Sequence, residues 1–192
     1  SMTYKYLMFD SRGNLVAHAT SVYAPRGKEW KMVIDDDDVE EAAKHSYLSL
    51  VGDSDAVPAM EGRILRWEGK TVVLEPVRPL EQKDRQNLRV PARFVSYLYS
   101  VSGAWKGRVP IVSHDLSSGG LAFFCPRSLQ VGEQVQVVIP VTANPLLLDM
   151  EILRCRSGPG QDLLYAGKFL SMLREAESMV REAVFHLQRQ KN

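Results

Sequence analysis

Short runs of strand-forming residues, each closed by Gly, Pro, Ser or Asn, recur along almost the whole chain. Strands at this spacing, with hardly a helix between them, are typical of antiparallel barrels and sandwiches. One short helix is expected from Val39 to His45, because the acidic run Asp35–Asp38 precedes it and carboxylates favour a helix amino terminus. We therefore predict a mainly all-β fold with strands at 4–9, 15–23, 30–34, 47–51, 62–67, 71–76, 92–101, 107–115, 119–126, 133–141, 146–155 and 162–170.

The segment from Val77 to Asn87 interrupts this pattern. It is polar, contains Pro79 and has no periodicity, which favours a linker. We place the domain boundary there, between an amino-terminal β-barrel-like domain over residues 2–80 and a second domain over residues 81–192. Six of the expected strands fall in the second domain, which predicts an antiparallel barrel or sandwich of six strands there.

The tail from Ser171 to Gln190 changes to helical spacing. Its hydrophobic residues fall on one stripe, while charged residues fill the other faces. The stripe consists of Leu173, Met179, Val180, Val184 and Leu187. We predict an amphipathic C-terminal α-helix that closes the second barrel, with a dimer or partner contact as the alternative use of the stripe.

Charge and hydropathy exclude several classes of protein. The 192 residues carry 24 basic and 23 acidic side chains, so the chain lacks the overall positive field of nucleic-acid-binding proteins. No hydrophobic run approaches the ~20 residues of a membrane span, and the amino terminus lacks a secretory pattern. Cys125 and Cys155 have no partners at metal-ligand spacing. We expect a cytoplasmic protein that has no membrane span and binds no nucleic acid, metal or cofactor.

Two polar segments carry the most specific chemical pattern in the sequence. Arg85 and Arg89 stand four residues apart, and Pro91 after them predicts an extended chain. The segment Asp115–Gly120, with the sequence DLSSGG, follows the second expected strand of the second domain. We expect these two segments to form the functional site.

The side chains of these segments suit a guanine nucleotide. The guanidinium groups of the two arginines can pair with phosphate or with O6 and N7 of guanine, and they can stack on a base. The other edge of guanine carries N–H donors, which a carboxylate such as Asp115 accepts, and the Ser117 hydroxyl can donate or accept. Gly119 and Gly120 allow positive φ in the turn and let a flat base approach the backbone.

An RxxxR pair followed by a DxSxxG loop at the start of a six-stranded barrel resembles the signature of the PilZ family. The matching residues are Arg85, Arg89, Asp115, Ser117 and Gly120. The resemblance implies a receptor without catalytic activity, in which the arginine segment wraps around cyclic di-GMP and the DxSxxG loop receives a guanine. It also implies that the residue before the first arginine, here Asp84, influences whether one ligand or an intercalated pair is bound.

The amino-terminal half resembles the extra β domain that precedes PilZ in receptors of the flagellar-brake type. The position of Arg85 and Arg89 in the expected linker suggests that cyclic di-GMP changes the arrangement of the two domains and so regulates a protein partner, such as the flagellar motor or another signalling target. The alternative is a PilZ-fold adaptor that binds no nucleotide and works through protein contacts. A homodimer is a further alternative.

Three other features have simpler explanations. His114 and Asp115 beside Ser117 suggest a hydrolase at first sight, but neighbours on a strand face opposite sides and no nucleophile elbow is present, so we expect no enzyme activity. The run Asp35–Asp38 lacks the alternating ligands and Gly of a calcium loop, which favours a solvated turn. The 3 tryptophans could form a platform for single-stranded nucleic acid, but such grooves are usually basic.

Overall fold

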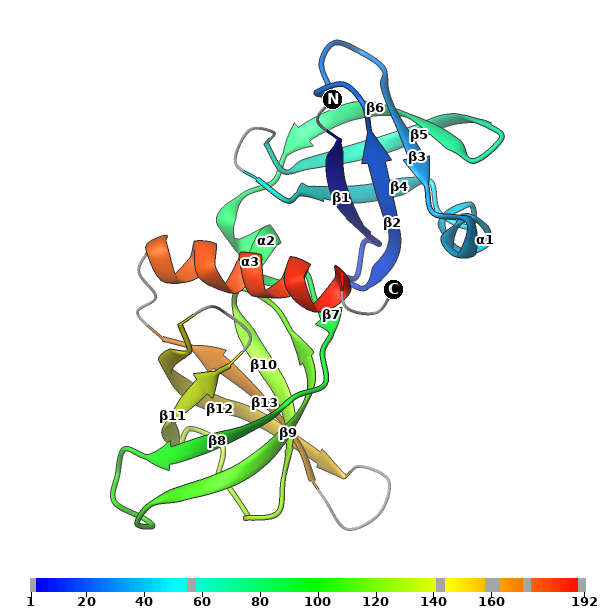
Figure 1. Cartoon of the computed structure of the whole chain (residues 1–192). Helices are drawn as coiled ribbons and strands as arrows, with labels where there is room; N and C mark the ends of the chain where they lie inside the picture. The colour runs from blue at the N-terminus through cyan, green and yellow to red at the C-terminus, as the bar shows by residue number, and fades with distance from the viewer. Residues whose placement is uncertain (1–2, 55–57, 141–143, 158–162, 171–173, 190–192) are drawn as a thin grey trace. The chain divides into compact units, whose positions relative to one another are not determined.

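Two β-barrels, one in each half of the chain, make up the computed structural model (Figure 1). The structure describes residues 3–54, 58–140, 144–157, 163–170 and 174–189. The chain separates into two compact units, Ser1–Leu88 and Arg89–Asn192. The domain boundary predicted between residues 80 and 81 stays a prediction, because compact units do not show where an independently folding domain begins. Among the described residues, no helix is long and hydrophobic enough to cross a membrane.

Six antiparallel strands close the first barrel in the order β1, β2, β3, β6, β5, β4. In β3 the side chains of Trp30, Met32 and Ile34 are buried and those between them are exposed, which is the period of two expected for a strand with one face on a core. All six strands expected in this half are confirmed, β1 and β3 with the expected bounds and the other four with shifted ends. They are β1 (Tyr4–Phe9), β2 (Leu15–Ser21), β3 (Trp30–Ile34), β4 (Tyr47–Gly52), β5 (Met60–Glu68) and β6 (Thr71–Pro79).

The short helix predicted after β3 is present but shorter than expected. A 3₁₀ turn, η1 (Asp36–Asp38), leads into helix α1 (Val39–Ala42). The helix therefore ends before His45, the predicted last residue, because the backbone N–H groups of Lys44 and His45 bond carbonyls only three residues back.

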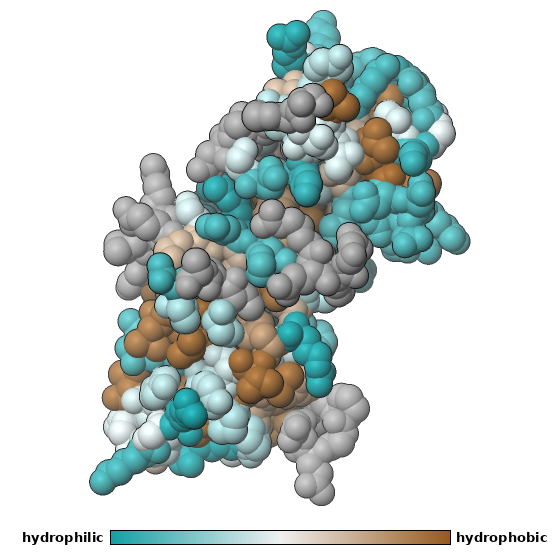
Figure 2. All heavy atoms as spheres, viewed as in Figure 1, coloured by the Kyte–Doolittle hydropathy of each residue, from teal (hydrophilic) through white to brown (hydrophobic). Residues whose placement is uncertain are grey.

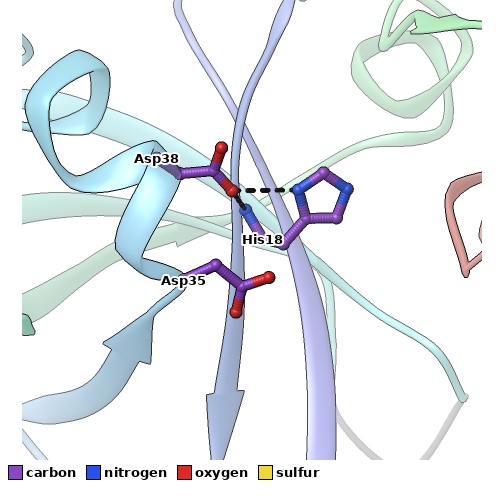
Figure 3. Close-up of side chains that lie close together, drawn as sticks. All are labelled: His18, Asp35 and Asp38. Carbon is purple, nitrogen blue, oxygen red and sulfur yellow. Dashed lines mark hydrogen bonds and ion pairs between the residues drawn. The ribbon is translucent and has the colours of Figure 1, made fainter. Parts of the chain in front are cut away.

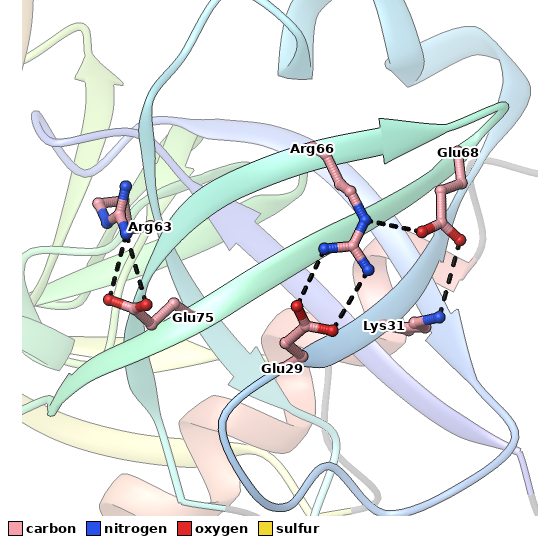
Figure 4. Close-up of polar contacts among 6 residues, drawn as sticks. All are labelled: Glu29, Lys31, Arg63, Arg66, Glu68 and Glu75. Carbon is pink, nitrogen blue, oxygen red and sulfur yellow. Dashed lines mark hydrogen bonds and ion pairs between the residues drawn. The ribbon is translucent and has the colours of Figure 1, made fainter.

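Exposed ion pairs run across the outer face of β3, β5 and β6 (Figure 4). Arg66 donates two hydrogen bonds to Glu29, at 2.9 and 3.2 Å, and one to Glu68 at 2.9 Å. These bonds raise the pKa of Arg66 and lower the pKa of Glu29. Two more pairs flank them, Lys31 with Glu68 and Arg63 with Glu75. Because water and salt screen exposed pairs, they connect neighbouring strands without adding much stability.

The segment predicted to be a linker is ordered. β6 continues to Pro79, the side chain of Leu80 is buried, and helix α2 (Gln82–Gln86) follows. The chain predicted to be extended before Pro91 is therefore helical at Arg85, and that prediction is wrong there. The restriction that proline imposes acts on the residue directly before it, so it does not reach back to Arg85.

A capping box explains why α2 forms in so polar a segment. The Glu81 backbone N–H donates to Asp84 Oδ2 at 3.0 Å, and Arg78 Nη1 donates to the same oxygen at 3.0 Å. The Glu81 side chain in turn accepts from the backbone of Asp84. The backbone hydrogen bond from Glu81, followed by the one from Arg78, lowers the pKa of Asp84.

Six antiparallel strands also close the second barrel. They run in the order β10, β13, β12, β11, β8, β9, and pairing of β9 with β10 completes the ring. The two-residue strand β7 (Val90–Pro91) pairs with the end of β9. The six strands are β8 (Val95–Ser100), β9 (Arg108–Leu116), β10 (Gly120–Cys125), β11 (Gln134–Ile139), β12 (Leu146–Ser157) and β13 (Leu163–Phe169). The predicted mainly all-β fold with a six-stranded second barrel is confirmed.

Helix α3 (Arg174–Arg189) confirms the predicted C-terminal amphipathic helix. Val180 and Val184, both in the predicted stripe, are buried, together with Ala183 and Phe185. Leu173, which was also placed in the stripe, lies outside the described residues. The predicted role of the helix in closing the barrel stays a prediction.

Part of the outer face of the second barrel is hydrophobic. Val95 on β8 stands opposite Val112 on β9, and Val138 on β11 stands opposite Leu147 on β12. Val95 and Leu147 are 62% and 56% exposed. Figure 2 shows brown hydrophobic side chains between polar ones on the visible surface of this unit. The outer face of this barrel is therefore not uniformly polar.

Candidate functional site

A β-bulge in β9 sets the direction of the side chains at the start of the DLSSGG segment. Ser113 pairs with Phe123 and Asp115 pairs with Ala122, so His114 is one extra residue in β9. Ser113 and Leu116 are buried in the barrel, whereas His114 is exposed and Asp115 is half-buried. The bulge thus places His114 and Asp115 on the same outer face. The prediction that they face opposite sides is wrong, because the extra residue interrupts the alternation of the strand.

His114 is held against Asp115. Its Nδ1 lies 2.7 Å from Asp115 Oδ2, so the ring N–H donates to the carboxylate. The edge of the imidazole packs against Phe124 of β10, with ring centroids 5.8 Å apart and planes at 74°. The ring contact with Phe124 holds the imidazole in place, and the hydrogen bond in turn holds one oxygen of Asp115.

The Ser117 hydroxyl shapes the turn between β9 and β10. The side chain is buried, and its Oγ accepts hydrogen bonds from the backbone N–H groups of Gly119 and Gly120, at 3.1 and 3.0 Å. The Ser117 backbone N–H donates to the Gly120 carbonyl at 3.0 Å. Both lone pairs of the hydroxyl are therefore used within the turn, and the role of Ser117 is to hold the shape of the loop.

Gly120 is required by packing between strands. A Cβ atom on Gly120 would stand closer than 3.0 Å to the carbonyl oxygen of Gly167 on β13, a separation that real Cβ atoms essentially never show. The turn does not use the positive φ that Gly119 and Gly120 allow. The described glycines with positive φ are Gly13, Gly27, Gly69, Gly103, Gly107 and Gly132.

Strand β7 brings Arg89 to the outer face that carries Asp115. Val90 pairs with Leu116 and Pro91 with Asp115, and both Val90 and Leu116 are buried. By strand alternation Arg89 and Pro91 face outward, on the side of Asp115. The buried Ser113 hydroxyl holds this segment by accepting from the Phe94 backbone N–H at 2.7 Å and donating to the Ala92 carbonyl at 2.5 Å.

Arg85 belongs to the other compact unit. It lies on α2, and its Nη1 donates to the Leu80 carbonyl at 2.9 Å. The structure thus brings five of the six predicted site residues together on the second barrel and leaves Arg85 on a separate body. The five are Arg89, Asp115, Ser117, Gly119 and Gly120.

A second polar cluster lies in the first barrel (Figure 3). His18 Nδ1 lies 3.0 Å from Asp38 Oδ2, and the His18 backbone N–H donates to the same oxygen at 2.9 Å. Asp35 adds a carboxylate, and one ligand atom from each of the three residues lies within 4.8 Å of the others. Because the two bonds to Asp38 connect β2 to η1, the cluster has a structural explanation. Asp35, Asp36 and Asp37 are exposed, as expected of a solvated turn, whereas Asp38 is half-buried against His18.

The family model described as PilZ domain matches residues 83–186, just over half of the chain. The chain belongs to the PilZ family. The match begins before Arg85 and ends within α3, so it spans both polar segments and the whole second barrel. No curated protein matches the chain.

Several solved structures resemble this PilZ chain. The Bacillus subtilis inhibitor of motility MotI/DgrA is 13% identical, with 98% of this chain and 97% of that chain covered and a TM-score of 0.46. Escherichia coli YcgR in complex with c-di-GMP is 12% identical, with 98% and 85% covered and a TM-score of 0.46. The PilZ domain of CeSA from a cellulose-synthesizing bacterium is 25% identical, with 52% and 97% covered and a TM-score of 0.41.

His114 is a residue of the candidate site that the sequence did not predict. Its place on the outer face follows from the bulge, because Ser113 pairs with Phe123 and Asp115 pairs with Ala122. The one signal in the sequence was two neighbouring polar residues where a strand with one buried face should have a hydrophobic residue at every second position.

Proposed function

We propose that this PilZ module binds cyclic di-GMP on the outer face of β9 and β10. The observation that carries the proposal is the β-bulge, which turns Asp115 outward beside Arg89 and holds one of its oxygens with His114. A carboxylate fixed in this way can accept the N1–H and N2–H donors of a guanine. An arginine on the same face can pair with the phosphate or with O6 and N7.

The surface beside Asp115 suits a flat base. Asp115 stands opposite Ala122 on β10, and Ala122 stands opposite Ala166 on β13. Gly120, one position further along this face of β10, has no side chain. Small side chains at these positions leave the strands without obstructions, so a purine ring can lie on them while its edge meets the carboxylate.

Arg85 would complete the clamp from the first unit. In this proposal the arginine segment closes over a ligand held on the second barrel, because the ligand offers anionic groups to both arginines. Movement of that segment onto the ligand changes how the two units are arranged and so exposes or hides a surface for a protein partner. Regulation of flagellar motility is the output that we propose for this change.

Calorimetry with cyclic di-GMP on the full chain tests binding. Wild type should release heat, and ligand at 100 times Kd should stabilise the protein by about 2.7 kcal/mol. Arg89→Ala and Asp115→Ala should each lose on the order of 2–5 kcal/mol of binding free energy, because a charged hydrogen-bonding group loses its partner. Lys106→Ala, which removes an exposed charge from the β8–β9 hairpin, should bind as wild type does.

Two results would overturn this proposal. A wild-type protein without heat or thermal stabilisation at high ligand concentration would favour the adaptor that binds no nucleotide. An Asp115→Ala variant with unchanged affinity would remove the guanine site from β9. Small-angle scattering tests the rearrangement separately, since curves that are identical with and without saturating ligand contradict it.

A further inference from the structure

Two arginines on β12 share the outer face that carries Asp115. Asp115 pairs with Ala122, Ala122 pairs with Ala166, and Ala166 pairs with Arg154, so these four residues form one row across β9, β10, β13 and β12. The four strands lie side by side in the second barrel in Figure 1. The next row runs from Phe124 through Leu164 to Arg156.

A second β-bulge turns Arg154 outward. Ile152 pairs with Gly167 and is fully buried, and the pairing then shifts by one residue before Arg154. Leu153 is the extra residue, so Arg154 and Arg156 are both exposed on the outer face. A β-bulge thus lies at each end of the row, and each bulge turns a charged side chain outward, at Asp115 and at Arg154.

The two residues between these charges in the row are small. Neighbouring strands lie about 4.8 Å apart, so the three steps from Asp115 to Arg154 span about 14 Å. Within the row, Ala122 and Ala166 are the intervening residues, and each carries only a methyl group. The row Phe124–Leu164 borders this floor on one side, and Lys168, which pairs with Gly120, borders it on the other.

The guanidinium groups of Arg154 and Arg156 are available to bind an anion. In the part of the chain that the structure describes, the side chains of Arg154 and Arg156 make no ion pair or hydrogen bond, whereas Lys168 stands opposite Glu151 on β12. Guanidinium groups on an exposed strand face present planar donors that match the oxygens of a phosphodiester.

We propose that the bound guanine nucleotide extends across this face, with its guanine at Asp115 and a phosphodiester held by Arg154, assisted by Arg156. The floor of Ala122 and Ala166 supports the base between the two charged ends. This inference rests on the proposed function, and it adds a phosphate subsite on β12 to a site that otherwise depends on Arg85 and Arg89.

Titration of cyclic di-GMP into the full chain tests this subsite. Arg154→Gln should weaken binding by about 10- to 100-fold, the loss expected for one charge-assisted contact, and Arg156→Gln should weaken it less. The affinity of Arg154→Gln should also depend less steeply on KCl concentration, because one ionic contact is missing. Its melting temperature without ligand should equal that of wild type, since the side chain is exposed.

Lys106→Gln is the matched control. It removes the same charge from the β8–β9 hairpin, and Arg108 at the end of that hairpin is about 23 Å along β9 from Asp115, at 3.3 Å per residue. If wild type binds cyclic di-GMP and Arg154→Gln binds equally well, the subsite is wrong while the proposed function stands. Equal losses in Arg154→Gln and Lys106→Gln would also overturn it, because a general charge effect explains them. A wild type that does not bind removes the proposed function itself.

Discussion

Gly120→Ala separates two explanations for the last glycine of the DLSSGG segment. If Gly120 serves to admit a ligand, the alanine variant should fold normally and lose only binding. The structure indicates a different reason, since a Cβ atom at this position would come within 3.0 Å of the Gly167 carbonyl oxygen on β13. The obstructing atom belongs to the backbone, so it cannot move away by a change of side-chain rotamer.

The expected loss follows from the strand pairing. To accept the methyl group, β10 and β13 must move apart at Gly120, where the Phe169 backbone N–H donates to the Gly119 carbonyl at 2.9 Å. Overpacking of this kind costs typically about 1–3 kcal/mol. For a unit of this size, each kcal/mol corresponds to about 4–8 °C in melting temperature. We therefore expect Gly120→Ala without ligand to melt about 4–24 °C below wild type.

Differential scanning calorimetry on the full chain without ligand measures this loss. Gly62→Ala on β5 is the control, because its Cβ would stand 3.4 Å from the nearest atoms of Leu74, which can shift slightly. That variant should melt within a few degrees of wild type. A Gly120→Ala protein that melts like wild type would refute the packing argument and return Gly120 to a role in ligand approach.

Three further predictions concern single side chains. His114→Ala should weaken cyclic di-GMP binding about 2- to 10-fold in calorimetry and leave the melting temperature unchanged, because the exposed imidazole only orients Asp115. Tyr165→Phe should lower stability in urea by about 1–3 kcal/mol, because the buried Leu129 backbone N–H, 2.9 Å from the hydroxyl, loses its acceptor. The pKa of Asp84 is lower in the folded chain, so its contribution is present above the unfolded value of ~3.9 and is lost as pH falls through the folded value. Asp84→Asn should therefore flatten the fall in melting temperature of the first unit between about pH 5 and pH 2, and an unchanged acid profile would contradict this assignment.

The sequence alone determined the mainly β fold and the residues of the candidate site. Strand-length runs separated by turn formers predict local structure, because the period of two in β3 and the turn residues of each loop act within a few positions. The RxxxR and DxSxxG patterns also lie in short segments, so Arg89, Asp115 and Ser117 could be chosen without coordinates.

Only the tertiary structure decided which way these side chains face and which groups they contact. The bulges at His114 and Leu153 depend on how β9 pairs with β10 and how β12 pairs with β13. The local sequence does not specify which residue is left unpaired in such a pair of strands. The same holds for Gly120. A side chain there would collide with the carbonyl oxygen of Gly167, which lies forty-seven positions away in the sequence. Contacts between distant strands determine the outer face on which the proposed ligand lies, because a strand's outward side is set by its neighbours as well as by its own sequence.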